Sequence, residues 1–284
     1  MTNSKSLIFS ILIVFSSVAY RSQTLSKETI LISTSFGDMK LKLYEETPLH
    51  KTNFLKLVRA GFYDSLLFHR VINSFMIQGG DPDSKRANDT VLLGNGDIGY
   101  WIPAEFNKNI YHKKGVIAAA REGDDVNPKK ESSGCQFYIV MGKKYDSTAL
   151  KKAEIRVNRD VVIKTNYLVG FGGKSKKLKE YYIRLFTQNK NDSLNWAVKQ
   201  LTDSVSIAEY FKSKRYTFSS AQKKTYETIG GTPHLDNNYT AFGEVIEGLE
   251  VIDKIAAVKT DKNDRPKENI RMKISITNDD KRKK

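Results

Sequence analysis

One stretch of the chain constrains its fold more than any other. It runs from Phe68 to Asp81 and reads Phe-His-Arg-Val-Ile-Asn-Ser-Phe-Met-Ile-Gln-Gly-Gly-Asp. Apolar, β-prone residues broken at Asn73-Ser74 and closed by Gly79-Gly80 predict two short strands joined by a tight turn. The stretch therefore predicts a β-hairpin that carries several unlike side chains within a few residues.

The two strands also predict which of these side chains lie together. Side chains alternate between the two faces of a strand, so Arg70, Met76 and Gln78 are expected to share one face. Phe75 can join them only through a bend at the turn. The predicted result is an arginine beside an apolar pocket.

The remaining sequence supplies more strands and two helices. Alternating or apolar runs predict further strands, and helical spacing with turn signals predicts a helix over 47–61, with Thr47 as its N-cap, and a second over 248–257. The predicted strands are a hairpin over 28–45 and single strands over 115–120, 136–141, 241–245 and 270–276. His50 and His112 are interpreted as solvent-exposed, and Cys135, the one cysteine, as a small buried packing residue.

Between residues 143 and 226 the amino-acid composition changes. This segment holds 19 basic and 7 acidic residues, which accounts for most of the net charge of +15. Apolar residues at helical spacing near 181–185, 196–201 and 207–211 predict two or three amphipathic helices. We interpret the segment as an inserted basic helical subdomain, which we expect to contact a protein partner or an anionic envelope surface.

The N-terminus indicates where the protein works. Residues 1–22 have a polar start, an apolar run from Leu7 to Phe15 and small residues at Ser17 and Ala19, the order of a secretory signal peptide. The expected product is a periplasmic or secreted protein. An uncleaved membrane anchor is the alternative, although the apolar run is well short of the roughly 20 residues of a membrane span. Export also argues against a specific nucleic-acid partner.

Three common enzyme chemistries find no support. The four histidines are scattered without the short spacings of metal ligands, so no metal site is predicted. The sequence has no nucleophile elbow, P-loop or dinucleotide fingerprint. No cofactor is expected.

The hairpin and several other motifs resemble the signature of cyclophilin-type peptidyl-prolyl cis/trans isomerases, in particular bacterial exported members. Besides Phe68–Ile72 and Phe75–Asp81, the matching segments are Gly115–Arg121, Ser133–Ile139, Leu235-Asp236 and Phe242–Val245. The resemblance covers residues 28–142 and 227–277, which leaves 143–226 as an insertion and 278–284 as a charged tail. It implies a mainly β fold, a closed eight-stranded antiparallel β-barrel capped by two helices.

The resemblance also implies an activity and a site. The expected activity is the cis/trans isomerisation of proline-containing polypeptides during the folding of exported proteins. Arg70, Phe75 and Gln78 are expected to be catalytic, with Arg70 hydrogen-bonding the prolyl nitrogen of the twisted amide. The expected substrate-binding residues are Met76, Ala120, Arg121, Gln136, Tyr138, His234, Leu235 and Tyr239.

Three positions depart from the best-known eukaryotic members of the family. Arg121 replaces an asparagine, Tyr138 a phenylalanine and His234 a tryptophan at the edge of the groove. The last departure implies weak cyclosporin binding at most. Two other functions remain open from the sequence: a proline-recognising binding module without turnover, and an envelope-surface protein that acts through its positive charge.

Overall fold

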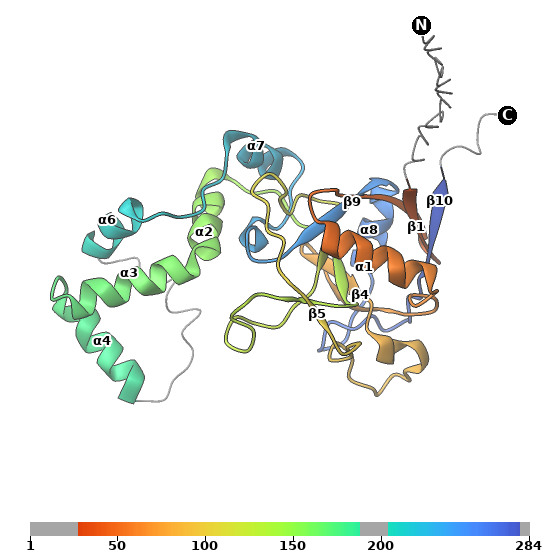
Figure 1. The fold of residues 1–284 in the computed structure, drawn as a ribbon, viewed down its shortest axis with the longest axis horizontal. Coiled ribbons are helices and arrows are strands. Elements are labelled where there is room, and N and C mark those ends of the chain that lie inside the picture. Colours follow the sequence, from red (N-terminus) through yellow and green to blue (C-terminus); the bar gives the residue numbers. More distant parts are fainter. Residues whose placement is uncertain (1–27, 188–203, 279–284) are drawn as a thin grey trace, which may run out of the picture.

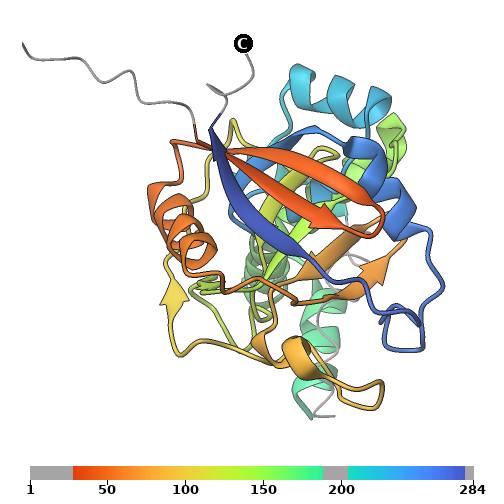
Figure 2. The ribbon, with the colours of Figure 1, turned by 90° about the vertical axis from the view of Figure 1, so that its right-hand side faces the viewer.

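A curled antiparallel sheet organises the computed structural model, which describes residues 28–187 and 204–278. Its strands pair in the order β10-β1-β2-β9-β6-β8-β4-β3. They are β1 (Glu28–Thr34), β2 (Gly37–Leu43), β3 (Phe68–Ile72), β4 (Met76–Gly79), β6 (Val116–Ala119), β8 (Phe137–Val140), β9 (Ala241–Glu247) and β10 (Lys273–Asn278). Two further short strands, β5 (Trp101–Ile102) and β7 (Ser132–Ser133), pair only with each other. Figure 2 shows how the sheet curls, with β10 beside the β1–β2 hairpin.

The predicted closed barrel is not confirmed. β3 and β10 are the two edges of the sheet, and no strand ladder joins them. The segments just before these strands meet at one isolated bridge, Leu67 to Arg271, with hydrogen bonds such as Phe68 N to Ile270 O at 2.9 Å. Farther along β3, Val71 N donates instead to the carbonyl oxygen of Asp264 in a loop. A loop, rather than strand β10, therefore lies beside the second half of β3, and the two edge strands form no ladder.

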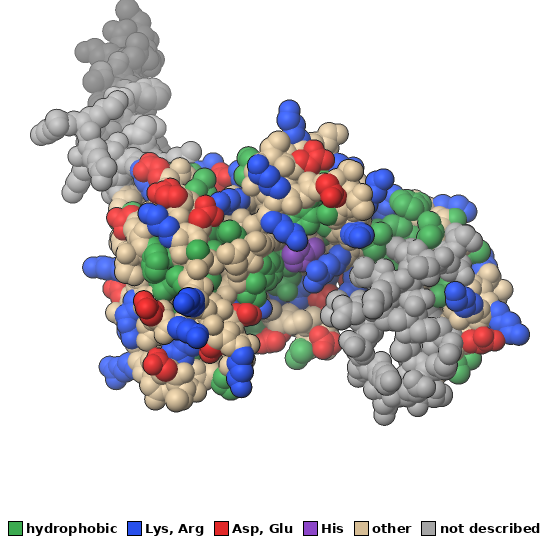
Figure 3. All heavy atoms as spheres, turned by 180° about the vertical axis from the view of Figure 1, so that it is seen from behind, with side chains coloured by type: hydrophobic (Ala, Val, Ile, Leu, Met, Phe, Trp, Pro, Cys, Tyr) green, Lys and Arg blue, Asp and Glu red, His purple; other side chains and the backbone are tan. Residues whose placement is uncertain are grey.

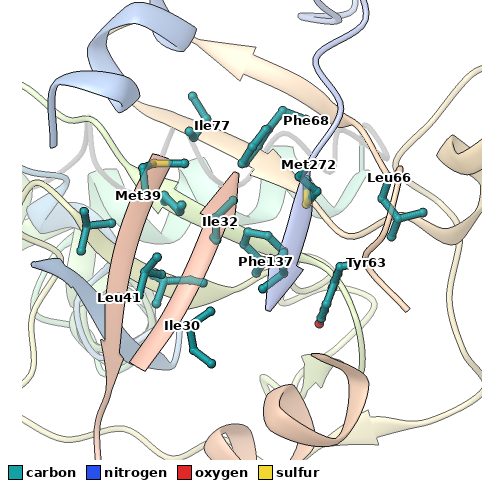
Figure 4. Close-up of a cluster of buried hydrophobic side chains, with 14 of the residues drawn as sticks. Ile30, Ile32, Met39, Leu41, Tyr63, Leu66, Phe68, Ile77, Phe137 and Met272 are labelled. Atoms are coloured by element: carbon teal, nitrogen blue, oxygen red, sulfur yellow. The ribbon is translucent and has the colours of Figure 1, made fainter. Parts of the chain in front are cut away.

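The main core lies inside the curl. Facing residues of β1, β2 and β10, such as Ile32 and Met39, are fully buried because every second side chain of these strands points inward. Figure 4 shows this cluster, which includes Phe137 and Tyr63, whose ring centres are 5.5 Å apart. Helices α1 (Pro48–Arg59) and α8 (Leu249–Ala256) bury their apolar faces against the same core. These are the two helices that the sequence predicted.

The insertion is more helical than predicted. It contains five helices within the described residues, α2 (Ser147–Val157), α3 (Arg159–Phe171), α4 (Lys176–Thr187), α6 (Ser204–Lys212) and α7 (Ser220–Thr228). Two 3₁₀ turns, η1 (Pro82–Arg86) and η2 (Pro233–Leu235), lie outside it. The apolar residues expected near 196–201, and the predicted signal peptide, lie outside the described residues.

Two helices connect the insertion to the sheet. α2 and α7 lie next to the sheet, whereas α3, α4 and α6 lie farther away (Figure 1). Leu150 and Val157 of α2 pack with Phe218 and with Tyr226 of α7, and α2 also packs against η2. α7 continues across the predicted boundary at residue 226, so the fold has no break there. Within the described ranges, no helix is long and apolar enough to cross a bilayer.

Candidate active site

The candidate site is a groove of about 290 Å³ on the face of the sheet opposite the main core. Strand alternation explains its position: Met76 and Tyr138 belong to the groove side, while Ile77 and Phe137 point into the core. The groove is lined by His69, Arg70, Phe75, Met76, Gln78, Gly94, Asn95, Ala120, Arg121, Glu122, Tyr138, Leu235 and Tyr239. Figure 3 shows this face, where Lys and Arg side chains surround a histidine beside an apolar hollow.

A chain of hydrogen bonds fixes the arginine at the groove. The register of the hairpin pairs Arg70 with Gln78, as the alternation predicted. Arg70 Nη1 donates to Gln78 Oε1 at 3.3 Å, and Gln78 Nε2 donates to Gln136 Oε1 at 3.1 Å. Gln136 Nε2 then donates to the carbonyl oxygens of Gly94 and Gly96 at 2.9 and 2.8 Å. The carbonyl groups of Gly94 and Gly96 therefore orient the guanidinium through the side-chain amides of Gln136 and Gln78.

Gln136 lies behind the groove rather than in it. It is 6% exposed, and its amide group is already bonded to Gln78 and to the two carbonyl groups. Its contact with substrate stays a prediction. In this structure it positions Gln78.

Arg70 also has an acidic neighbour. Its Nε lies 3.5 Å from Asp264 Oδ2, and both side chains are 43% exposed. Such a long, solvated pair holds the guanidinium only weakly.

The apolar part of the groove rests on a buried polar chain. The hydroxyl of Tyr138 lies 3.0 Å from His112 Nε2, and His112 Nδ1 lies 2.9 Å from Asp236 Oδ1. A carboxylate can only accept, so His112 donates to Asp236 from Nδ1. Burial raises the pKa of Tyr138 well above its usual range, so its hydroxyl keeps its proton. Tyr226 of α7 donates to the other oxygen of Asp236 at 2.7 Å.

The second wall of the groove contains the remaining predicted residues. Arg121 lies with its guanidinium carbon 4.4 Å from the ring centre of Tyr239, and it also pairs with Asp124 at 2.6 Å. His234 does not line the groove itself. Its ring stacks on Phe75 at 5.6 Å and borders a neighbouring cavity. Burial, followed by the charges of Arg156, His112 and Lys143, lowers its pKa to about 3.

The structure thus brings together nine of the eleven predicted site residues along one groove. Gln136 and His234 lie immediately behind or beside it. Four lining residues were not predicted: His69, Gly94, Asn95 and Glu122. The Gly94-Asn95-Gly96 turn could have been noticed, because two glycines around an asparagine favour a tight loop that approaches other groups closely. Among the described residues, no group of three His, Cys, Asp or Glu side chains is placed to hold a metal.

Two histidine interpretations were wrong. His112 is 1% exposed because its partner Asp236 lies under the groove, and His50 is 2% exposed beside Glu105 at 2.6 Å. Glu105 also accepts hydrogen bonds from the first backbone N–H groups of α1, at 3.0 Å each. Thr47 occupies the N-cap position, but its side chain makes no capping bond. Cys135 is buried, as predicted.

Comparison with known proteins identifies the class to which this fold and groove belong. The family model for cyclophilin-type peptidyl-prolyl cis-trans isomerases matches residues 29–162 and 155–276. The chain therefore belongs to the cyclophilin-type peptidyl-prolyl cis-trans isomerase family.

Individual relatives agree with this assignment. A Streptococcus pyogenes protein named as a bifunctional phosphatase/peptidyl-prolyl cis-trans isomerase is 28% identical over 85% of the chain, which spans 37% of that protein's length. A Staphylococcus aureus protein named as a peptidyl-prolyl cis-trans isomerase is 27% identical, over 84% of the chain and 85% of its own length. A crystal structure of a Cryptosporidium parvum cyclophilin-type isomerase aligns with a TM-score of 0.50 and 20% identity, over 88% of this chain and 97% of that one.

Proposed function

We propose that this chain accelerates the rotation of X–Pro bonds in exported polypeptides, and that Arg70 stabilises the twisted bond. Partial double-bond character gives the peptide bond a barrier of about 18–20 kcal/mol. Isomerisation of X–Pro bonds takes tens to hundreds of seconds, slow enough to limit folding. A group that interacts with the twisted amide more strongly than with the planar one lowers this barrier.

The observation that carries the proposal is the fixed guanidinium beside an apolar pocket. Twisting breaks the conjugation and leaves a lone pair on the prolyl nitrogen, which Arg70 can meet with an N–H donor. A hydrogen bond to a charged group contributes about 1.5–3 kcal/mol, which corresponds to about 10- to 150-fold in rate. Gln78 and Gln136 restrict the orientation of the guanidinium before substrate binds, so little ordering is needed at the moment of reaction.

The apolar residues supply the other part of the mechanism. Met76, Leu235 and the ring of Tyr138 are almost fully buried, and Phe75 packs beside them. We assign the proline ring to this surface, where it is held while the bond turns. A proline ring bound there would displace water from the groove, and the hydrogen bond from Arg70 would then be stronger than it is in bulk solvent.

The setting of this activity is also part of the proposal. The secretory pattern of residues 1–22 supports a periplasmic or secreted location, where newly exported chains fold. The basic insertion extends away from the sheet on the side of α2 (Figure 1), where we expect it to contact a protein partner or an anionic envelope surface.

A protease-coupled assay on a short proline peptide tests the mechanism. We expect Arg70→Ala to lower kcat/KM by about 10- to 150-fold while the far-UV spectrum and melting temperature stay unchanged. Arg59→Ala is the matched control, because Arg59 pairs with Glu28 on the surface, away from the groove. Near-normal turnover of Arg70→Ala would refute the assigned role.

A double-mutant cycle extends the test to the amide chain. Gln78→Ala alone is expected to lower kcat/KM by about 2- to 12-fold, the value of one ordinary hydrogen bond. If Gln78 acts by orienting Arg70, its removal has little further effect in the Arg70→Ala background. Fully additive losses would show that Gln78 acts independently.

A further inference from the structure

A second cavity lies beside the groove. It has a volume of about 200 Å³ and shares Arg121, Leu235 and Tyr239 with the groove. Its far side is formed by the insertion, through Arg156 at the end of α2 and Arg159 at the start of α3. The inserted helices therefore extend the surface on which a bound polypeptide would lie.

The wall that carries Arg156 is firmly attached. Asn238 Nδ2 donates to the carbonyl oxygen of Val157 at 3.0 Å, which ties the end of α2 to the segment after η2. Lys130 bridges the same two parts, with Nζ 2.6 Å from Asn238 Oδ1 and 3.2 Å from Asp160. The cavity is thus part of the folded structure rather than a gap between loosely attached parts.

The charges around the cavity are unequally engaged. Arg121 pairs with Asp124, and Lys130 pairs with Asp160. Arg156 is exposed and, within the described part of the chain, has no hydrogen-bond or ion-pair partner. Asp125 also has no partner among the described residues. Whether the cavity prefers an acidic or a basic side chain therefore depends on which of these two charges, Arg156 or Asp125, lies nearer to the groove.

His234 lies where the cavity meets Phe75, and it reports on the charge at this point. Burial is the main cause of its low pKa, and the charges that add to this effect are Arg156, His112 and Lys143. No carboxylate opposes them. Arg156 and Lys143 therefore place positive charge near His234, at the edge of the groove.

We propose that the second cavity is a subsite for the part of the substrate that flanks the proline, and that Arg156 selects an acidic side chain there. The proposal rests on the isomerase function proposed above. An aspartate or glutamate would complete the ion pair that Arg156 lacks, whereas a lysine would be repelled by Arg156. In this way the insertion gives the groove a preference that the sheet alone cannot provide.

The expected effect is moderate because Arg156 is exposed. A solvated ion pair corresponds to about a two- to fivefold preference. Salt screens such pairs, so the preference should shrink at 1 M NaCl, where the Debye length falls to about 3 Å. Binding of a neutral peptide should depend much less on salt.

The experiment uses the full chain and three series of fluorescent proline peptides. The three series carry Glu, Gln and Lys, respectively, at a single position up to two residues before or after the proline. Both Kd and kcat/KM are measured for each peptide. For at least one position we expect the wild type to favour Glu over Lys by about two- to fivefold. Arg156→Glu should reverse this order. Lys151→Glu is the matched control, because Lys151 makes the same charge change on α2 but does not line the cavity.

The outcomes separate the two proposals. Absence of turnover with every peptide, together with a Glu preference in Kd that Arg156→Glu reverses, would refute the activity but support the subsite. Equal Kd values for Glu and Lys peptides at all positions would refute the subsite, whatever the turnover. An equal change in Arg156→Glu and Lys151→Glu would also refute it, because general charge would then explain the preference.

Discussion

The two walls of the groove are built in different ways. One wall consists of strands, and its functional side chains form the chain Arg70, Gln78 and Gln136. The other wall consists of η2, the segment up to Tyr239 and helix α2, and it rests on Asp236. The first wall is set by backbone register: Arg70 and Gln78 are eight residues apart on one hairpin, and Gln136 directly precedes β8, the strand that pairs with β4. The second is set by buried bonds between distant segments.

This difference explains how each wall can vary. A strand wall cannot shift by one residue without moving every side chain to the opposite face, so its geometry is strictly specified. The second wall can accept a long insertion, because its position depends on a few anchoring contacts. The arginine that we propose to lower the barrier lies on the strand wall, and the proposed selectivity lies on the inserted one.

The largest expected effect comes from removing the anchor of the second wall. Asp236 is fully buried and accepts from His112 N, His112 Nδ1 and the hydroxyl of Tyr226. Asp236→Ala leaves three buried donors unpaired, at about 1–3 kcal/mol each. We expect the free energy of unfolding to fall by at least about 3 kcal/mol, as measured in urea.

Two further variants control this test. Asp253→Ala removes a carboxylate that pairs with Lys114 but is 45% exposed, and it should cost less than about 1 kcal/mol. Tyr226→Phe removes a single donor and should cost about 1 kcal/mol, so it gives a readout even if Asp236→Ala does not fold. Unchanged urea midpoints for both Asp236→Ala and Tyr226→Phe would show that the second wall has another anchor.

The sequence predicts the strand wall well and the second wall poorly. Arg70 and Gln78 are eight residues apart on a hairpin, so alternation alone places them on one face. His112 and Asp236 are 124 residues apart, and nothing local marks them as partners. His112 was therefore predicted to be exposed. The position of Arg156 is hidden for the same reason, because helical spacing does not show that α2 packs against η2.

A smaller effect distinguishes the walls by pH. Burial lowers the pKa of His234 in the second wall to about 3 and that of His69 in the strand wall to about 4. Both histidines have a usual pKa of about 6.5, so between these values the unfolded chain binds protons that the folded chain does not. Stability therefore falls as the pH decreases below about 6.5.

The variant His234→Gln removes one of these two contributions. Between pH 7 and pH 5 it should lose about 1–2 kcal/mol less stability than the wild type, measured by urea unfolding at each pH. The remaining dependence of stability on pH comes from His69 and from other titrating groups. If the two proteins lose equal stability over this range, burial does not hold His234 neutral in the folded chain.

The smallest expected effect concerns the strand wall itself. Asp264→Asn removes the charge that lies 3.5 Å from Arg70 Nε but keeps the shape of the side chain. Asparagine also tolerates the left-handed backbone of this position, where φ is 63°. The bond from Val71 N to the carbonyl oxygen of residue 264 should persist, so the loop should stay in place.

The outcome decides what orients Arg70. Both partners of the ion pair are 43% exposed, so its loss should lower kcat/KM by less than about fivefold, and 1 M NaCl should reduce the difference from the wild type. Gln78 would still hold the guanidinium through Nη1. A loss as large as that of Arg70→Ala would mean that the loop carboxylate, not the amide chain, positions Arg70. Strand register alone would then not explain the geometry of the strand wall.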